Sequence, residues 1–262
     1  MYNLLKFEVY KLKHNKIFLS SLMITLLLII YSIYLFFHSK VTLKILETSL
    51  QGNEFGFIVN NFKDRLHPKA IEFFYSSFGF SPCIAIILIF IVGSLVLDEF
   101  SSGTINNTIV YGHTRDEIYI SKFITASLSG LILTALLLFG TIALGSFINF
   151  SREFLSFNDL IKSIEFTILA ALILSSLTSI YMCLSMFIQN KLIFITLIIL
   201  TIILTTSYPP CFESIIKYSP IFMLIDMSSF KPDPYSIIFS SFIIIVITII
   251  IGILRFNKLE LK

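Results

Sequence analysis

The residue types that carry catalytic or metal-binding chemistry are few and scattered in this chain of 262 residues. Its three cysteines, Cys83, Cys183 and Cys211, show no C-x-x-C spacing, and its histidines form no H-E-x-x-H pair. These spacings predict neither a disulfide framework nor a zinc site. The four histidines are His14, His38, His67 and His113. We therefore expect no metal and no cofactor bound by this chain.

Two sequence motifs of hydrolytic enzymes are also missing from the chain. It contains no G-x-x-x-x-G-K phosphate-binding loop and no G-x-S-x-G turn, which P-loop ATPases and many serine hydrolases require. No Ser-His-Asp or Cys-His set can be placed at a single membrane depth. The sequence thus predicts a chain that is not an enzyme and that takes any energy it uses from a partner.

Polar residues that could bind such a partner gather in residues 98–122, which read DEFSSGTINNTIVYGHTRDEIYISK. Gly103 allows a sharp bend. The residues after it predict a short helix over 104–111, with Ile105 and Ile109 on one face. A short helix between two bends is typical of a docking element for another protein. The alternative is a solvated connector.

The end of this loop carries a second local signal. Thr114 is followed three residues later by Glu117, which is the spacing of a capping box at a helix N-terminus. A helix is therefore expected to begin here and to continue past Lys122 into the next apolar segment. A connector needs neither the bends nor the capping box, so both features favour the docking element.

The composition defines the elements that must position this loop. Hydrophobic residues make up 56% of the chain and charged residues 13%, and the mean hydropathy is +0.91. Soluble domains carry about a quarter charged residues, so a soluble enzyme, a nucleic-acid-binding domain and a disordered protein are excluded. We expect an all-α integral membrane protein that forms one domain over residues 1–262.

Six apolar segments are long enough to be membrane-spanning helices, which need about 20 mostly apolar residues each. They are residues 17–37, 80–97, 123–148, 166–188, 192–208 and 236–254. The fifth is marginal in length. None contains Asp, Glu, Lys, Arg or His. Because ion-coupled and proton-coupled transporters place ionisable groups inside the membrane, this pattern argues against a self-powered transporter.

Residues 1–16 predict an amphipathic helix that lies in the membrane interface. Tyr2, Leu5, Val9 and Leu12 share one face of a helical wheel, and the lysines of this segment can meet anionic lipid headgroups. The same lysines favour an orientation with both termini inside the cell. The Lys and Arg totals on the two sides are nearly equal, ten against nine, so this count alone barely decides the orientation.

Two segments are expected on the outer side. Residues 38–79 carry Leu43, Leu46 and Leu50 at helical spacing, which predicts a helix against the membrane surface. Residues 209–235 contain apolar pieces that are too short to span a membrane and are separated by proline. They predict two short re-entrant helices in the outer leaflet before the last span.

Small and hydroxyl residues recur every three to four positions in the third and fourth apolar segments. Such stripes let membrane helices approach closely, which is the structural interpretation. The alternative is that they line a path for an amphipathic or apolar substrate. The positions in question are Thr134, Thr141, Ser175, Ser179 and Met182.

The loop of residues 98–122 resembles the corresponding loop of the ABC-2 type permeases. The matching positions are Glu99, Gly103, Thr104, the run Gly112-His113-Thr114-Arg115, and Lys122. The number of spans, the N-terminal interfacial helix and the short outer helices before the last span are similar too. The resemblance thus covers the layout of the whole chain, and specific residues only in this loop.

The resemblance implies the membrane subunit of an ATP-driven transporter. Two ATP-binding subunits, which hold ATP and magnesium, and a second permease subunit, a copy or a paralogue, would be its partners. The helix over 104–111 would be the coupling helix, and Glu99 and Arg115 would brace its two ends. Both termini and this loop would lie on the cytoplasmic side of a bacterial plasma membrane.

Compact members of this family in low-GC bacteria look like permeases that expel antimicrobial peptides, as in bacitracin resistance and lantibiotic immunity. The expected function is therefore export of an antimicrobial peptide or another amphipathic compound. Two other classes stay open. One is a membrane module that senses peptides and signals without transport, and the other is a membrane-embedded enzyme.

Overall fold

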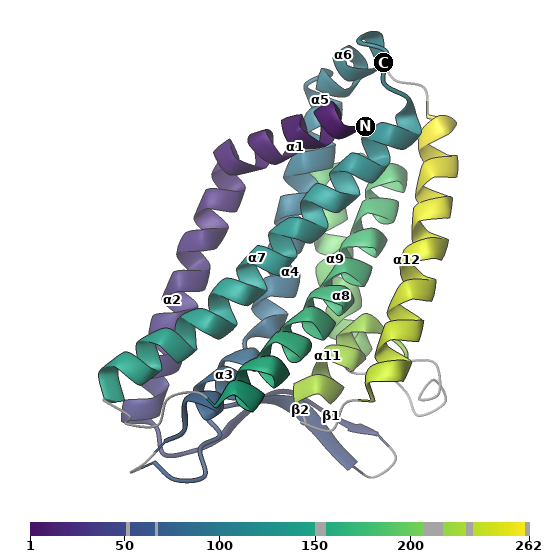
Figure 1. Cartoon of the computed structure of the whole chain (residues 1–262). Coiled ribbons are helices and arrows are strands. Elements are labelled where there is room, and N and C mark those ends of the chain that lie inside the picture. Colours follow the sequence, from purple (N-terminus) through teal and green to yellow (C-terminus); the bar gives the residue numbers. More distant parts are fainter. Residues whose placement is uncertain (51–52, 66–67, 150–155, 207–216, 229–232, 260–262) are drawn as a thin grey trace.

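The fold is given by a computed structural model, which describes residues 1–50, 53–65, 68–149, 156–206, 217–228 and 233–259. Long helices packed side by side make up most of it (Figure 1). Helix α1 (Tyr2–His14) and the C-terminal end of α12 (Pro234–Asn257) lie at one end of the bundle, here called the terminal end. The strands β1 (Leu43–Leu50) and β2 (Asn53–Val59) lie at the opposite end, here called the hairpin end.

Within the described residues, five helices are long and apolar enough to cross a membrane, so the chain is a multi-pass membrane protein. The second is continuous through three elements: α4 (Ser81–Val92), the π-helical turn η1 (Gly93–Leu97) and α5 (Asp98–Ser101). The other four are α2 (Lys16–His38), α7 (Arg115–Asn149), α8 (Phe157–Phe187) and α12. These five match the first, second, third, fourth and sixth predicted spans.

The predicted fifth span, residues 192–208, corresponds to α9 (Lys191–Thr206). This helix has 16 residues, which at about 1.5 Å per residue extend about 24 Å, less than the roughly 30 Å of a hydrocarbon core. Residues 207–208 lie outside the described chain. The expected helix is present, but a total of six spans is not confirmed.

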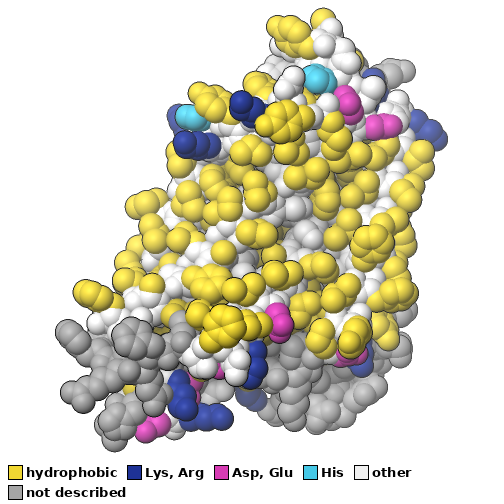
Figure 2. All heavy atoms as spheres, in the orientation of Figure 1, with side chains coloured by type: hydrophobic (Ala, Val, Ile, Leu, Met, Phe, Trp, Pro, Cys, Tyr) yellow, Lys and Arg dark blue, Asp and Glu magenta, His cyan; other side chains and the backbone are white. Residues whose placement is uncertain are grey.

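The bundle exposes an apolar exterior between two polar ends. Figure 2 shows hydrophobic side chains over the middle of one face, with most of the charged side chains towards the two ends. Helices α2 and α12 are the least buried of the five long helices, and their outward residues are large and apolar, among them Leu27, Ile30, Phe239 and Phe242. In water such a surface would be strongly unfavourable, whereas lipid tails solvate it.

The helix expected within residues 38–79 is replaced at its start by a β-hairpin. Strand β1 pairs antiparallel with β2, with a bulge between Ile45 and Thr48. The spacing of Leu43, Leu46 and Leu50 does not mark a helix face, because the backbone of Leu46 has φ of +54° at the bulge. Helical structure begins only at α3 (Ala70–Phe78). The expectation of a helix here was wrong, and the fold is mostly helical with one small sheet.

One short helix lies in the segment expected to hold two re-entrant helices. Helix α11 (Pro220–Ser228) packs against α8 and β2 with most of its side chains buried. The hydroxyl of Ser228 accepts a hydrogen bond from the backbone N–H of Ile58, at 2.8 Å, which joins α11 to the free edge of β2. The rest of the predicted segment includes residues 209–216 and 229–232, which lie outside the described chain, so the second short helix stays a prediction.

A close contact between α7 and α12 allows a prediction about how a larger side chain at Gly252 would affect stability. A Cβ added at Gly252 would lie 2.1 Å from the Tyr119 hydroxyl oxygen, and the Tyr119 ring is itself buried. We therefore expect Gly252→Ala to lower the free energy of unfolding by about 1–3 kcal/mol, the usual effect of overpacking. Thermal unfolding of the purified chain in detergent measures this.

The matched control is Gly130→Ala, also within a membrane helix. A Cβ there meets the ends of the Leu88 side chain at 3.4 Å, an ordinary contact, and alanine favours a helix over glycine. This variant should be neutral or slightly stabilised. Equal destabilisation by both substitutions would contradict the close approach of α12 to Tyr119.

Candidate functional site

The loop of residues 98–122 forms a short helix that protrudes at the terminal end (Figure 1). Helix α6 (Thr104–Val110) lies between two glycines with positive φ, Gly103 at +68° and Gly112 at +93°. Glycine adopts this backbone region at little cost, so the two residues allow the chain to turn sharply before and after α6. The predicted bend and the predicted helix are both confirmed.

Helix α6 has a buried side and an exposed tip. Ile105 is only 2% exposed, and Ile109 packs against the core while partly buried. At the tip, Val110 and Tyr111 are each 85% exposed. Tyrosine is among the residues enriched where proteins bind one another, so this tip is a candidate contact surface.

The start of α7 is joined to the N-terminus of the chain. The backbone N–H of Glu117 donates to the Thr114 hydroxyl at 3.3 Å, which is one half of the predicted capping box. The Glu117 carboxylate instead accepts from the N-terminal ammonium of Met1 at 3.4 Å and lies 3.4 Å from Nδ1 of His113. Met1, which directly precedes α1, thus contacts the loop.

A buried group of charges lies at the base of the loop. The ammonium of Lys122 on α7 donates to both carboxylate oxygens of Glu8 on α1, at 3.1 and 3.3 Å. It also donates to Oε2 of Glu99 on α5, at 2.6 Å, and to the carbonyl of Leu95, at 3.0 Å. The side chains of Lys122 and Glu8 are 3% and 1% exposed. A charge so far from water is stable only when it is paired and hydrogen-bonded.

Lys11 of α1 completes this group by pairing with Oε1 of Glu99. The four side chains carry two positive and two negative charges, so the group is neutral in total. We call Glu8, Lys11, Glu99 and Lys122 the buried charge cluster. Because Glu99 and Lys122 stand at the two ends of the loop, their pairing joins its stems, and α1 is held against both.

The buried face of α1 differs from the predicted one. Leu4, Glu8 and Leu12 are buried, whereas Tyr2 is 78% exposed. The wheel had placed Tyr2, Leu5 and Val9 with Leu12 on the apolar side. The helix is rotated from that expectation because Glu8 turns inward to reach Lys122. An amphipathic helix is present, and its buried face includes a carboxylate.

Arg115 contacts the last helix. One guanidinium nitrogen donates to the carbonyls of Phe256, Asn257 and Leu259, at 2.7, 3.1 and 2.7 Å. A cation at a helix C-terminus satisfies unpaired carbonyls and interacts favourably with the helix dipole. The guanidinium also lies over the Phe256 ring. Arg115 therefore fixes the end of α12 beside the loop.

The contacts of Glu99 likewise run mainly into the bundle. Its carboxylate belongs to the buried charge cluster, and its backbone carbonyl accepts from the Thr104 hydroxyl at 3.3 Å. Its neighbour Asp98 pairs with Lys191 at the start of α9, at 2.7 Å. The base of α6 is thus joined to α1, α7, α9 and α12, while the bracing role expected of Glu99 and Arg115 stays a prediction.

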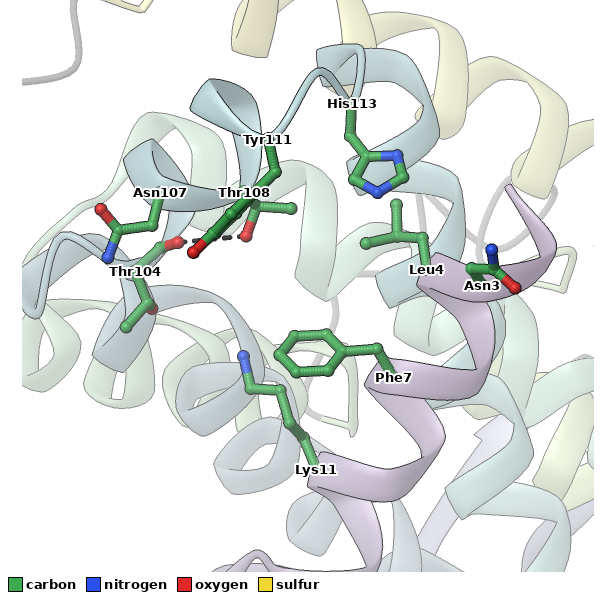
Figure 3. Close-up of a pocket in the computed structure, with 9 residues that line it drawn as sticks. All are labelled: Asn3, Leu4, Phe7, Lys11, Thr104, Asn107, Thr108, Tyr111 and His113. Atoms are coloured by element: carbon green, nitrogen blue, oxygen red, sulfur yellow. Dashed lines mark hydrogen bonds between the residues drawn. The ribbon is translucent and has the colours of Figure 1, made fainter.

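A hollow separates α6 from α1. It has a volume of about 430 Å³. Figure 3 shows Phe7 and Lys11 of α1 on one side, with Thr104, Thr108 and Tyr111 of the loop on the other. The hollow adjoins the exposed tip of α6, so the two form one continuous surface with an aromatic wall and a cationic edge.

The stripe residues lie inside the helix packing of the single chain. The Thr141 hydroxyl donates to Ser77 Oγ at 2.9 Å, between α7 and α3, and Thr248 of α12 donates to Ser179 Oγ at 2.8 Å. Thr134 and Met182 are buried, while Ser175 is partly exposed and donates to the carbonyl of Leu172. This placement matches the helix-contact interpretation of the stripes.

Sequence reasoning missed two members of the buried charge cluster, Glu8 and Lys11. A signal for Glu8 was present, since a single acid lies among Leu4, Leu5, Val9 and Leu12 on a face that otherwise reads as apolar. An unpaired acid there would be costly, which implies a basic partner. Which base that is cannot be read from the sequence, because Lys122 is 114 positions away.

The fold and this site define a class of protein, a multi-pass membrane protein with a protruding helix held on a buried charge cluster. No family model matches the chain, and no curated protein is significantly similar to it.

The buried charge cluster makes a prediction about stability. Lys122→Met leaves Glu8 with no cation, so we expect a loss of about 3–5 kcal/mol in the free energy of unfolding. The double variant Glu8→Leu/Lys122→Met removes one charge of each sign and keeps the Lys11–Glu99 pair. It should recover most of that loss. Chemical unfolding of both variants in detergent tests this, and a double variant no more stable than the single one would contradict the pairing.

Proposed function

We propose that this chain is the membrane-spanning permease subunit of an ATP-driven transporter, in which α6 is the coupling helix that seats on an ATP-binding subunit. The observation that carries the proposal is the geometry of α6. It combines glycine bends at both ends, a buried Ile105 side, and a tip formed by Val110 and Tyr111 that is 85% exposed. A connector that only joins two spans needs none of these features.

The surface around α6 supports contact with a folded protein. The exposed tip and the hollow lined by Phe7 and Tyr111 offer apolar area, and exposed lysines of α1, such as Lys6 and Lys13, add positive charge beside it. A complementary partner surface would present an apolar side chain flanked by acids. Such complementarity raises the association rate and the specificity of a complex.

The connections at the base of α6 support a mechanical role. Through Glu99 and Lys122 the base is joined to α1 and α7, through Arg115 to the end of α12, and through Asp98 to α9. A push on α6 when two ATP-binding subunits close would therefore move these helices together, and the loop would not simply bend. Rocking of the spans between two states would be the result.

The complete transporter would contain two ATP-binding subunits, which carry ATP and magnesium, and a second permease subunit, a copy or a paralogue. The terminal end would then face the cytoplasm of a bacterial cell, and the five long helices would lie in its plasma membrane. The proposed substrate is an antimicrobial peptide or another amphipathic compound. The apolar, uncharged faces of the long helices suit such a substrate, which would pass between the two permease subunits.

The proposal is tested by coexpressing the chain with candidate ATP-binding subunits from its own genome. We expect one of them to copurify and to hydrolyse ATP in lipid. Tyr111→Ala should lower the amount that copurifies about tenfold, since losing an aromatic anchor at an interface costs about 1.4 kcal/mol or more. Quantified copurification and ATPase rates measure this.

Tyr235→Ala is the matched control, because Tyr235 is 84% exposed but belongs to the first turn of α12, at the opposite end of that helix from the terminal end. It should leave both readouts unchanged. The proposal fails if no ATP-binding subunit associates with the chain, and the assignment of α6 fails if the two tyrosine variants behave alike.

A second substitution tests the bend before α6. Proline cannot adopt the φ of +68° found at Gly103, whereas asparagine tolerates this region. We expect Gly103→Pro to abolish the stimulation of ATPase activity by the assembled permease and Gly103→Asn to retain most of it. Because nothing lies within 4 Å of a Cβ added there, Gly103→Asn should keep the wild-type unfolding temperature. Gly103→Pro also loses the hydrogen bond from the Gly103 N–H to the Phe100 carbonyl, so its unfolding temperature is measured beside its ATPase activity to show that the chain is still folded. A fully coupled Gly103→Pro chain would refute the role of this bend.

A further inference from the structure

A crevice runs beside the elbow at Asn15, where α1 ends and α2 begins. Its apolar part is a groove of about 470 Å³ between α2 and α4, lined by residues such as Ile17, Ile24, Leu28 and Phe90. From Ile17 to Leu28 the helix rises about 16 Å, close to the roughly 15 Å depth of one leaflet's hydrocarbon. The groove is therefore about as long as an acyl chain within one leaflet.

The polar atoms in this groove are already satisfied. The hydroxyls of Ser20 and Ser21, which line it, donate to the carbonyl of Ile17 at 2.8 and 2.7 Å. An occupant thus finds apolar walls and few free hydrogen-bonding groups. Such a groove suits a hydrocarbon chain and disfavours a polar ligand.

A polar hollow lies farther along the same two walls, on the side of the terminal end. It has a volume of about 560 Å³ and is lined by Tyr10, His14 and Asn15 on one wall and by Ser94 and Ser102 on the other. The amide of Asn15 donates to Ser94 Oγ at 3.1 Å, and this bond links the two walls of the hollow at the end nearest the groove. On each wall, the first residue of the apolar groove lies within about one helical turn of this hydrogen bond. The crevice is thus apolar at membrane depth and polar beyond it.

The charges around the elbow favour an anion. The acids of the polar hollow are already paired, Asp98 with Lys191 and Glu99 with Lys11 and Lys122. By contrast, Lys13 and Lys16 are exposed and make no ion pair within the described part of the chain. Lys16 lies one helical turn before Ser20, a residue of the groove, and so on the same side of α2 and nearer the terminal end. The unpaired charge at this end of the groove is positive.

We propose that this crevice binds one anionic phospholipid from the leaflet at the terminal end. One acyl chain lies along the groove between α2 and α4, and the headgroup occupies the polar hollow beside Lys16. The site rests on the crevice and its charges, and it does not depend on the proposed transport function. Lipid bound there would stabilise the elbow, since a ligand that binds only the folded state shifts the folding equilibrium.

The absence of tryptophan from the chain allows a direct test. Ile24→Trp places a single fluorophore in the groove, and Leu27→Trp places one on the same helix but on a residue that does not line it. Each full-length variant is reconstituted with increasing fractions of brominated phosphatidylglycerol or brominated phosphatidylcholine, whose acyl chains quench tryptophan. Ile86→Trp, on the facing wall, serves if Ile24→Trp does not fold.

We expect the groove variant to be half-quenched at about a fivefold lower fraction of phosphatidylglycerol than of phosphatidylcholine, the effect of about one lysine near an anionic headgroup. The Leu27→Trp chain should respond equally to both lipids. Adding Lys16→Gln should remove the preference in the groove.

Two outcomes would overturn the proposal. Equal quenching by both lipids in the groove variant would mean that bulk lipid fills the groove without selection. Absence of quenching there, with normal quenching of the Leu27→Trp chain, would mean that protein covers the groove, as in a dimer through α2 and α4.

Discussion

The terminal end of this molecule depends on the cost of burying charge. Lys122 is almost inaccessible to water, and it is tolerable there only because Glu8, Glu99 and the carbonyl of Leu95 surround it. Removing two ions from water costs several kcal/mol each, and only close, well-hydrogen-bonded pairing repays it. The positions of α1, α5 and α7 are therefore interdependent, since a shift of α7 would leave Glu8 without its cation and a shift of α5 would remove the carboxylate that Lys11 and Lys122 share.

That constraint explains why the loop can protrude and still be well placed. Its stems are joined by Glu99 and Lys122, so α6 stands on a closed base even though Val110 and Tyr111 at its tip are mostly exposed. The π-helical turn at Gly93–Leu97 contributes here. A π-turn adds one residue to the helix and changes the direction of the residues after it. Asp98 and Glu99, which come next, face α9 and α7 respectively.

The features that sequence predicts well are those that depend on neighbours along the chain. The long apolar runs predicted the five long helices. Gly103 and Thr114 marked the residues just before α6 and α7 begin. Features that depend on distant partners were missed. Glu8 meets Lys122 across 114 positions, and Arg115 meets carbonyls near residue 257. The hairpin was missed because three leucines happened to repeat at helical spacing, while the β-branched and aromatic residues of 55–59 favoured a strand.

The distance in sequence between Glu8 and Lys122 has a consequence for biosynthesis. Glu8 leaves the ribosome first, and its basic partner is made 114 residues later. At the usual 5–20 residues per second, the interval is roughly 6–23 s. During that time α1 cannot take its final place, because its carboxylate would be buried alone. The N-terminal helix must therefore wait in water or among headgroups while the first two long helices are inserted, and it docks as a late step of assembly.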